Sequence, residues 1–128
     1  MNNWFRSAVQ EALFLGDKRL RADPAAVERV CRVLAVMLLR SAADPSEAER
    51  LRSSIAKALR ALKTVKDEGR FPGKGVGHAV VSQIGWAQSH PTYGLARGMD
   101  AAAVEAQRRA VVDLLGEAMR SVMQPTGG

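Results

Sequence analysis

The chain has 128 residues, of which 47% are apolar and 25% charged, values that are ordinary for one compact globular domain and argue against a disordered chain. The single cysteine, Cys31, excludes an internal disulfide, and its apolar neighbours predict a buried side chain rather than a nucleophile. The net charge of +6 favours an acidic partner, although a GC-rich genome also encodes arginine in excess over lysine.

Apolar periodicity and helix-capping residues predict an all-α fold, a compact single-domain bundle of four to five helices. A glycine-rich segment, 69–99, precedes the last helix and holds most of the glycines of the chain. The expected helices cover about 3–15, 24–41, 45–67, 77–89 and 100–123, and 124–128 is expected to be a frayed tail.

The first expected helix begins at Asn3 as its cap and places Trp4 and Phe5 on its apolar face. Met1–Gly16 lacks the basic start and unbroken apolar stretch of a secretory signal. The most apolar stretch, "VCRVLAVMLL", is too short to span a bilayer and contains Arg32. We therefore expect a cytoplasmic protein with no membrane partner.

The second expected helix follows Asp23-Pro24, a capping residue with proline in the first turn. Its apolar arc is broad, and Val36 and Leu39 fall outside that arc. The helix is therefore expected either to lie at the centre of the bundle or to contact a second partner. An exposed face of this kind also allows a homodimer through residues 24–41.

The third expected helix begins at "DPSE", residues 44–47, where a glutamate follows the cap by three positions. One face is apolar and is expected to be buried. It consists of Leu51, Ile55, Ala58, Leu59, Leu62 and Val65.

The opposite face of this helix is basic. Its cations are Arg50, Arg52, Lys57, Arg60 and Lys63, with Lys66 at the border, and Arg70 and Lys74 continue the charge beyond the helix. No acidic residue occurs between Arg50 and Lys66, so the helix is expected to lack the i,i+4 ion pairs of an ordinary solvated helix. This pattern favours an anionic partner. The alternative is a solubilising face neutralised from neighbouring helices, by Glu28, Glu105 or Glu117.

The stretch "RFPGKGVGHAVV", residues 70–81, raises the question of a phosphate-binding loop. A Walker loop is excluded because "GRFPGKG" is one residue short, lacks the Ser or Thr, and follows a helix rather than a strand. A simple hinge between two helices is the alternative interpretation.

The ten residues "GVGHAVVSQI" resemble the hairpin of helix-hairpin-helix DNA-binding modules. The resemblance implies a turn over Gly75–Gly77, with Val81 and Ile84 packed behind it and backbone N–H groups that hold a phosphate. The chain departs from the pattern in two places. An extra "GK" follows Pro72, and Val81 occupies a position where alanine is usual, so the family is not assigned.

The aromatic and histidine residues of this segment suggest contacts but no chemistry. Trp86 and Tyr93 are candidates for stacking on bases, and Arg97 for an anchor at a protein interface, although such aromatic residues more often fill the core. His78 and His90 lack cysteine neighbours and metal-ligand spacing. No catalytic constellation or cofactor fingerprint is present, so we expect no enzyme, metal or cofactor.

Two functions remain open. The first is a small binding or regulatory protein that engages an anionic partner, preferably nucleic acid, through the basic face of 50–74. The second is a protein–protein adaptor or inhibitor, of the kind that phages and plasmids encode against host machinery, which docks on an acidic protein surface through the basic helix and the 69–99 loop. The candidate binding residues are Arg50, Arg52, Lys57, Arg60, Lys63, Arg70, Lys74, Gly75, Gly77, Trp86, Tyr93 and Arg97.

Overall fold

The computed structural model describes residues 24–69, 71, 75–90 and 96–123, and within these ranges it contains helices and no strand. The all-α prediction is confirmed for this part of the chain. Its helices are α3 (Pro24–Ala43), α4 (Pro45–Asp67), α5 (Val76–Ser89) and α6 (Ala101–Met123). The helix expected over 3–15 and the tail 124–128 lie outside the described residues.

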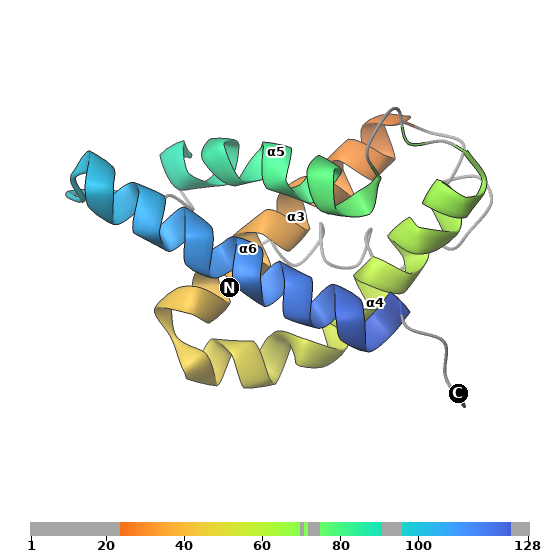
Figure 1. Cartoon of the computed structure of the whole chain (residues 1–128), viewed down its shortest axis with the longest axis horizontal. Coiled ribbons are helices and arrows are strands. Elements are labelled where there is room, and N and C mark those ends of the chain that lie inside the picture. The colour runs from red at the N-terminus through yellow and green to blue at the C-terminus, as the bar shows by residue number, and fades with distance from the viewer. Residues whose placement is uncertain (1–23, 70, 72–74, 91–95, 124–128) are drawn as a thin grey trace.

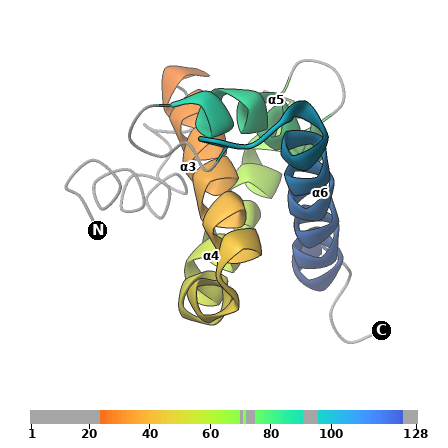
Figure 2. The same cartoon turned by 90° about the vertical axis from the view of Figure 1, so that its left-hand side faces the viewer.

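Helix α3 lies at the centre of the described bundle and packs against α4, α5 and α6 (Figure 1). In the view turned by 90°, α6 lies on one side, α3 and α4 on the other, and α5 crosses above them (Figure 2). Val36 and Leu39 are accordingly buried, with exposed fractions of 1% and 0%. The apolar surface all around α3 thus follows from its central position. A homodimer through α3 would require an exposed apolar face, and that face is buried against the other helices of the same chain.

The hydrophobic core is formed where the other helices meet α3. Leu34 and Met37 of α3 are fully buried, as are Leu59 of α4, Ile84 of α5 and Val111 of α6. Full burial of a side chain of this size contributes about 1.5–3 kcal/mol to stability. The helices are therefore held in place by tertiary packing as well as by their own propensity.

Helix α4 begins at the predicted cap. Asp44 has an extended backbone, its carboxylate accepts the backbone N–H of Ser46 at 3.0 Å, and Pro45 occupies the first turn. The six apolar residues predicted to form the buried face of this helix are the ones that the structure buries. This part of the sequence prediction is confirmed.

Helix α5 forms although its β-branched residues are also typical of a strand. Val80, Ile84 and Ala87 recur at helical spacing and are fully buried, so the helix places its apolar residues on one face against the core. The helix ends before His90, whose ψ of 131° is extended, as expected for a residue that precedes a proline.

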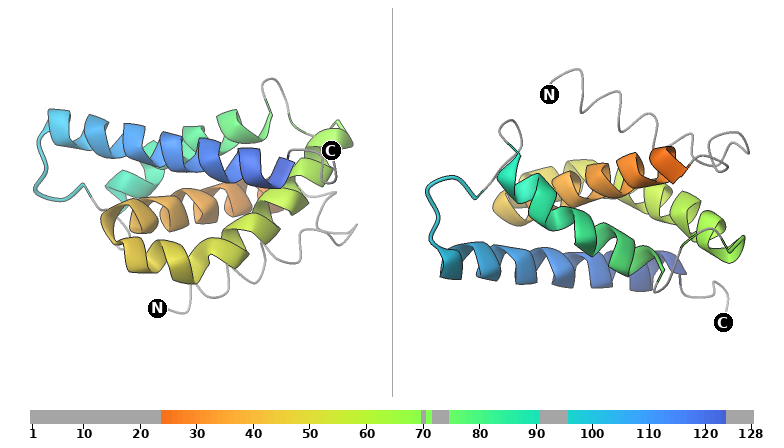
Figure 3. Two further views of the ribbon diagram at one scale, coloured as in Figure 1. Left: turned by 60° about the horizontal axis from the view of Figure 1, so that its bottom comes forward. Right: turned by 90° about the horizontal axis from the view of Figure 1, so that it is seen from above.

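Helix α6 runs along the bundle, and α5 crosses it obliquely when the molecule is seen from above (Figure 3). The carboxylate of Asp100 accepts the N–H of Ala103 at 2.8 Å and caps the first turn. Val111 and Leu115 are buried, but Val112, which the sequence places on the same face, is 38% exposed. The residues of α6 that meet the core are Val111 and Leu115, with Leu114, Ala118, Met119 and Val122 partly buried against it.

None of the helices in the described ranges is both long and apolar enough to cross a membrane.

Candidate functional site: the basic face of helix α4

The orientation of helix α4 is fixed by its N-terminal cap and by its buried face. Asp44 accepts hydrogen bonds from the Ser46 hydroxyl at 2.8 Å and from the Ser46 N–H, and these bonds lower the pKa of its carboxyl group. An ionised cap at this end also complements the positive end of the helix dipole. The capped start and the buried face together fix which side of α4 turns to solvent.

The structure places the predicted basic residues of α4 at the surface. Arg50, Arg52, Lys57 and Arg60 are exposed, and Lys63 is partly exposed. The helix contains six basic and three acidic residues, and therefore has a net charge of 6 − 3 = +3. A positive face is present, although it is less concentrated than the sequence suggests.

Three of these cations form ion pairs within α4, which corrects the expectation that the helix lacks such pairs. Arg50 contacts Glu47 at 2.6 Å, Arg52 contacts Glu49 at 3.0 Å, and Lys63 contacts Asp67 at 3.5 Å. The interval between Arg50 and Lys66 holds no acidic residue. The acidic partners lie just outside it, within reach at i,i+3 and i,i+4. Among the described residues, the neighbouring-helix acids Glu28, Glu105 and Glu117 do not take this role.

Lys57, Arg60 and Lys66 remain without an ion pair to any described residue, and all three are exposed. Lys57 and Arg60 are three positions apart and project from the middle of the outer face of α4. They form the part of the basic face whose charge is not already compensated by a neighbouring carboxylate.

The glycine turn expected over Gly75–Gly77 is shorter than the hairpin resemblance implies. Only Gly75 precedes α5, as its N-cap, while Val76 and Gly77 already belong to the helix. Gly75 has φ 90° and ψ −164°, a conformation that is nearly exclusive to glycine. A Cβ at Gly75 would lie 3.2 Å from Cε of Lys66, so the end of α4 and the start of α5 are close together.

Gly77 has a packing role in α5. A Cβ on this residue would lie 3.5 Å from the sulfur of Met119, which places the first turn of α5 against α6. Of the residues expected behind the turn, Ile84 is fully buried and Val81 is partly buried. The segment thus contributes to the junction of three helices, and the phosphate-binding role assigned to it stays a prediction.

Trp86 does not join the basic face of α4. The Arg32 guanidinium of α3 lies 5.0 Å from the Trp86 ring centroid, and the His90 ring lies 4.6 Å away at a tilt of 44°. Nε of Arg32 also donates to the Gln83 side chain at 3.1 Å. Trp86 is therefore part of a contact between α3 and α5 that resembles a structural cation–π pair more than an open stacking platform.

The other predicted site residues are not brought to α4 by the described structure. Arg97 is exposed in the segment before α6. Arg70, Lys74 and Tyr93 lie outside the described residues.

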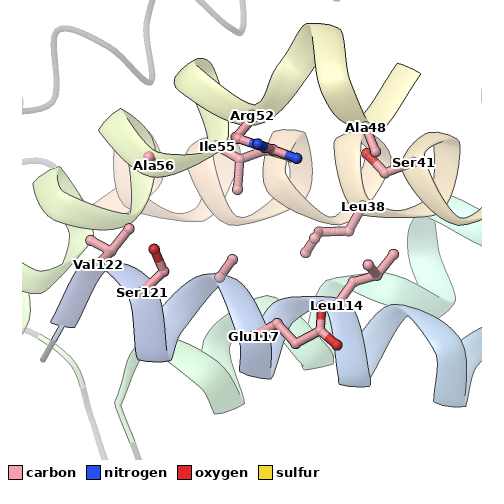
Figure 4. A pocket seen from close by; sticks show the side chains of 11 residues that line it. Leu38, Ser41, Ala48, Arg52, Ile55, Ala56, Leu114, Glu117, Ser121 and Val122 are labelled. Carbon is pink, nitrogen blue, oxygen red and sulfur yellow. The ribbon is translucent and has the colours of Figure 1, made fainter. Parts of the chain in front are cut away.

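A groove that the sequence did not predict lies between α4 and α6, with a volume of about 260 Å³ and with α3 at its floor (Figure 4). Apolar and small side chains line most of it, with Arg52 on the α4 wall and Glu117 on the α6 wall. The sequence feature that could have predicted this groove is a set of small residues at its walls, Ala48, Ala56 and Ala118. Small residues at helical spacing beside a larger apolar stripe leave space at the surface.

Two observations bear on chemistry. Within the described residues no group of three or more His, Cys, Asp or Glu side chains has the arrangement of a metal site. Cys31 is 2% exposed, and burial, together with the nearby Glu28 carboxylate, raises the pKa of its thiol to about 12. The predicted burial of Cys31 is confirmed, and its thiol is poorly suited to act as a nucleophile.

No protein-family model, no curated protein and no solved structure matches this chain.

Proposed function

We propose that this protein is a non-enzymatic binding or regulatory protein that engages an anionic partner, preferably nucleic acid, through the exposed face of α4. The observation that carries the proposal is the pair Lys57 and Arg60. Both are exposed, adjacent on one helix face and without an ion pair to any described residue. Phosphate groups are the usual partners of such cations on nucleic-acid-binding proteins.

The surrounding charges support the same partner. Arg50, Arg52 and Lys63 flank the pair, and their ion pairs with Glu47, Glu49 and Asp67 lie at the surface. Surface ion pairs of this kind contribute only about 0–1 kcal/mol, so a phosphate can replace the carboxylate at little cost. Arg70 and Lys74 follow α4 in the sequence and belong to the proposed site on that basis. Binding is expected to show little sequence preference, since contacts to phosphates carry no base information.

The test is fluorescence anisotropy with labelled duplex DNA, single-stranded DNA and RNA across a salt series. The double variant Lys57→Gln/Arg60→Gln is expected to weaken binding and to reduce the slope of log K against log salt by about 1.8 for duplex DNA, or about 0.9 for each lost phosphate contact. The matched control is Arg108→Gln/Arg109→Gln, which removes the same charge from α6, where both arginines already contact Glu105.

The control variant is expected to keep the slope of the unmodified protein. Equal losses in the two double variants would mean that only net charge matters, and would contradict a site on α4. An absence of binding to all three nucleic acids at low salt would remove nucleic acid as the partner. Far-UV circular dichroism of each variant shows whether the helices are retained.

A second candidate function is a protein–protein adaptor or inhibitor, and the groove beside Arg52 is the observation that favours it. In that case the basic face steers an acidic protein surface toward the groove. A cytoplasmic location, as expected from the sequence, suits both candidates.

A further inference from the structure

The groove between α4 and α6 runs along both helices, and its volume of about 260 Å³ is enough for a few side chains of a partner that lies across it. On the α4 wall it is lined by Ala48, Arg52 and Ile55, and on the α6 wall by Leu114, Ala118 and Ser121. Each set has the spacing i, i+4, i+7, so both walls extend over about two helical turns, or about 12 Å. Figure 4 shows the two walls running side by side, with Leu38 of α3 between them.

Small side chains let a partner approach the floor of this groove. Ala48 and Ala56 lie on one wall and Ala118 on the other, whereas Leu38 and Ile55 reach the groove from the core and are only 2% and 7% exposed. Helices pack at about 8–10 Å between their axes, and the shorter distances require small residues at the contact. The apolar surface that a partner helix reaches therefore comes from the partly buried residues of the two walls, which are Ala48, Ala56, Leu114, Ala118 and Val122.

The charges at the rim define the chemistry of the partner. Arg52 lies on one wall, and its side chain is 76% exposed in its pair with Glu49, which is itself 74% exposed. Glu117 lies on the opposite wall, is exposed, and has no ion pair to any described residue. A partner that fits both walls has a carboxylate on the flank near Arg52 and a cation on the flank near Glu117.

We propose that the α4–α6 groove binds two turns of an amphipathic helix from another protein, with apolar residues at i, i+3 or i+4, and i+7, an acidic residue opposite Arg52 and a basic residue opposite Glu117. This is the helix-in-groove mode of peptide recognition. A nucleic acid strand fits less well, because apolar walls and the Glu117 carboxylate disfavour phosphates. The groove shares Arg52 with the basic face but does not include Lys57 or Arg60, and it does not depend on the function proposed for that pair.

The experiment uses the full chain as bait for a displayed library of amphipathic helical peptides about 16 residues long, long enough to cover the groove. The library places Leu, Ile, Val or Met at the apolar positions and varies both flanks. Selected peptides are synthesised with a fluorophore, and their affinities are measured by anisotropy against the unmodified protein and its variants.

Two matched variants test the location. Ser121→Trp places a large side chain in the groove at an exposed position of α6, whereas Ser53→Trp places the same side chain at an exposed position of α4 outside it. Ser121→Trp is expected to weaken peptide binding by about tenfold or more, and Ser53→Trp by less than about twofold. Thermal melts of both variants show whether either has lost its fold.

The charges are tested separately. Arg52→Gln and Glu117→Gln are each expected to weaken the selected peptides by about threefold or more, because each removes one partner of a charge pair at the interface rim. The selected peptides are expected to carry acidic residues on one flank and basic residues on the other. If neither substitution changes the affinity of the selected peptides, the proposed orientation is contradicted.

Other occupants give different results, and each would overturn the proposal. If no selected peptide loses affinity in Ser121→Trp, the groove is not a helix site. If sedimentation shows a dimer that Ser121→Trp converts to monomer, a second copy covers the groove. If native mass spectrometry shows a bound apolar small molecule that Ser121→Trp removes, the site is a ligand pocket. If Ser121→Trp abolishes DNA binding, the groove belongs to the nucleic-acid surface.

Discussion

Two glycine-to-alanine substitutions in and beside α5 are expected to change stability in opposite directions. Gly85 lies inside the helix at an exposed position, and nothing lies within 4 Å of the place where a Cβ would be. Alanine is more favourable than glycine by about 0.8–1.0 kcal/mol in a helix interior. Gly85→Ala is therefore expected to stabilise the protein by nearly that amount and to raise Tm by about 3–5 °C.

Gly75→Ala is expected to destabilise the protein. The residue has φ 90° and ψ −164°, and forcing a side-chain-bearing residue into that region costs about 1–3 kcal/mol. The new Cβ would also lie 3.2 Å from Cε of Lys66, although the end of that flexible side chain can move. The expected result is a fall in Tm of about 4–12 °C, obtained by the same conversion.

The comparison is made by urea denaturation and thermal melts followed by circular dichroism, with Gly69→Ala as a third variant. Gly69 also has a positive φ, of 75°, but a Cβ there would meet nothing within 4 Å. The stability change of Gly69→Ala therefore measures the cost of backbone strain alone, without a steric contact of the new side chain. If Gly75→Ala were as stable as the unmodified protein, the glycine would not be required at the start of α5, and the geometry of the α4–α5 junction would be wrong.

Two further outcomes are expected at single residues. Because the folded-state pKa of Asp44 is lowered below 3.8, its carboxylate contributes stability that is present above that value and is lost as the pH falls through the folded-state pKa. The variant Asp44→Asn keeps a capping side chain but has no carboxylate to protonate. Urea titrations from neutral pH to about pH 3 should therefore show that it loses less stability than the unmodified protein. Equal losses in the two proteins would refute this prediction. Cys31, buried and with its thiol pKa raised to about 12, should react with an aromatic disulfide reagent at mildly alkaline pH only when the protein opens. If the thiol reacted as fast in the native protein as in urea, its burial would be contradicted. The variant Cys31→Ser has no thiol and gives the background rate.

The sequence predicted well those features that depend on neighbours along the chain. The cap at Asp44 and the buried face of α4 follow from local signals, since a capping side chain acts over three residues and an amphipathic stripe repeats every turn. The broad apolar surface of α3 likewise indicated either a central helix or contact with a second partner, and the structure places α3 against three other helices.

The functional surface was predicted less well, because ion pairs and packing partners are chosen in space. Sequence patterning made Lys63 part of an uncompensated basic run, but its carboxylate partner Asp67 lies one turn further along α4. Trp86 lies near basic residues in the sequence, yet its ring contacts Arg32, which comes from α3. The exposure of Val112 depends on how narrowly α6 meets the core, and helical periodicity does not report that width.

The amino-acid sequence by itself determined the helical class and the face of α4 that is buried, because both depend on periodicity within a few residues. Tertiary structure alone decided that the walls of α4 and α6 stand apart over Leu38 and leave a groove between Arg52 and Glu117. These two residues are far apart in the chain and face one groove because α4 and α6 both pack against α3.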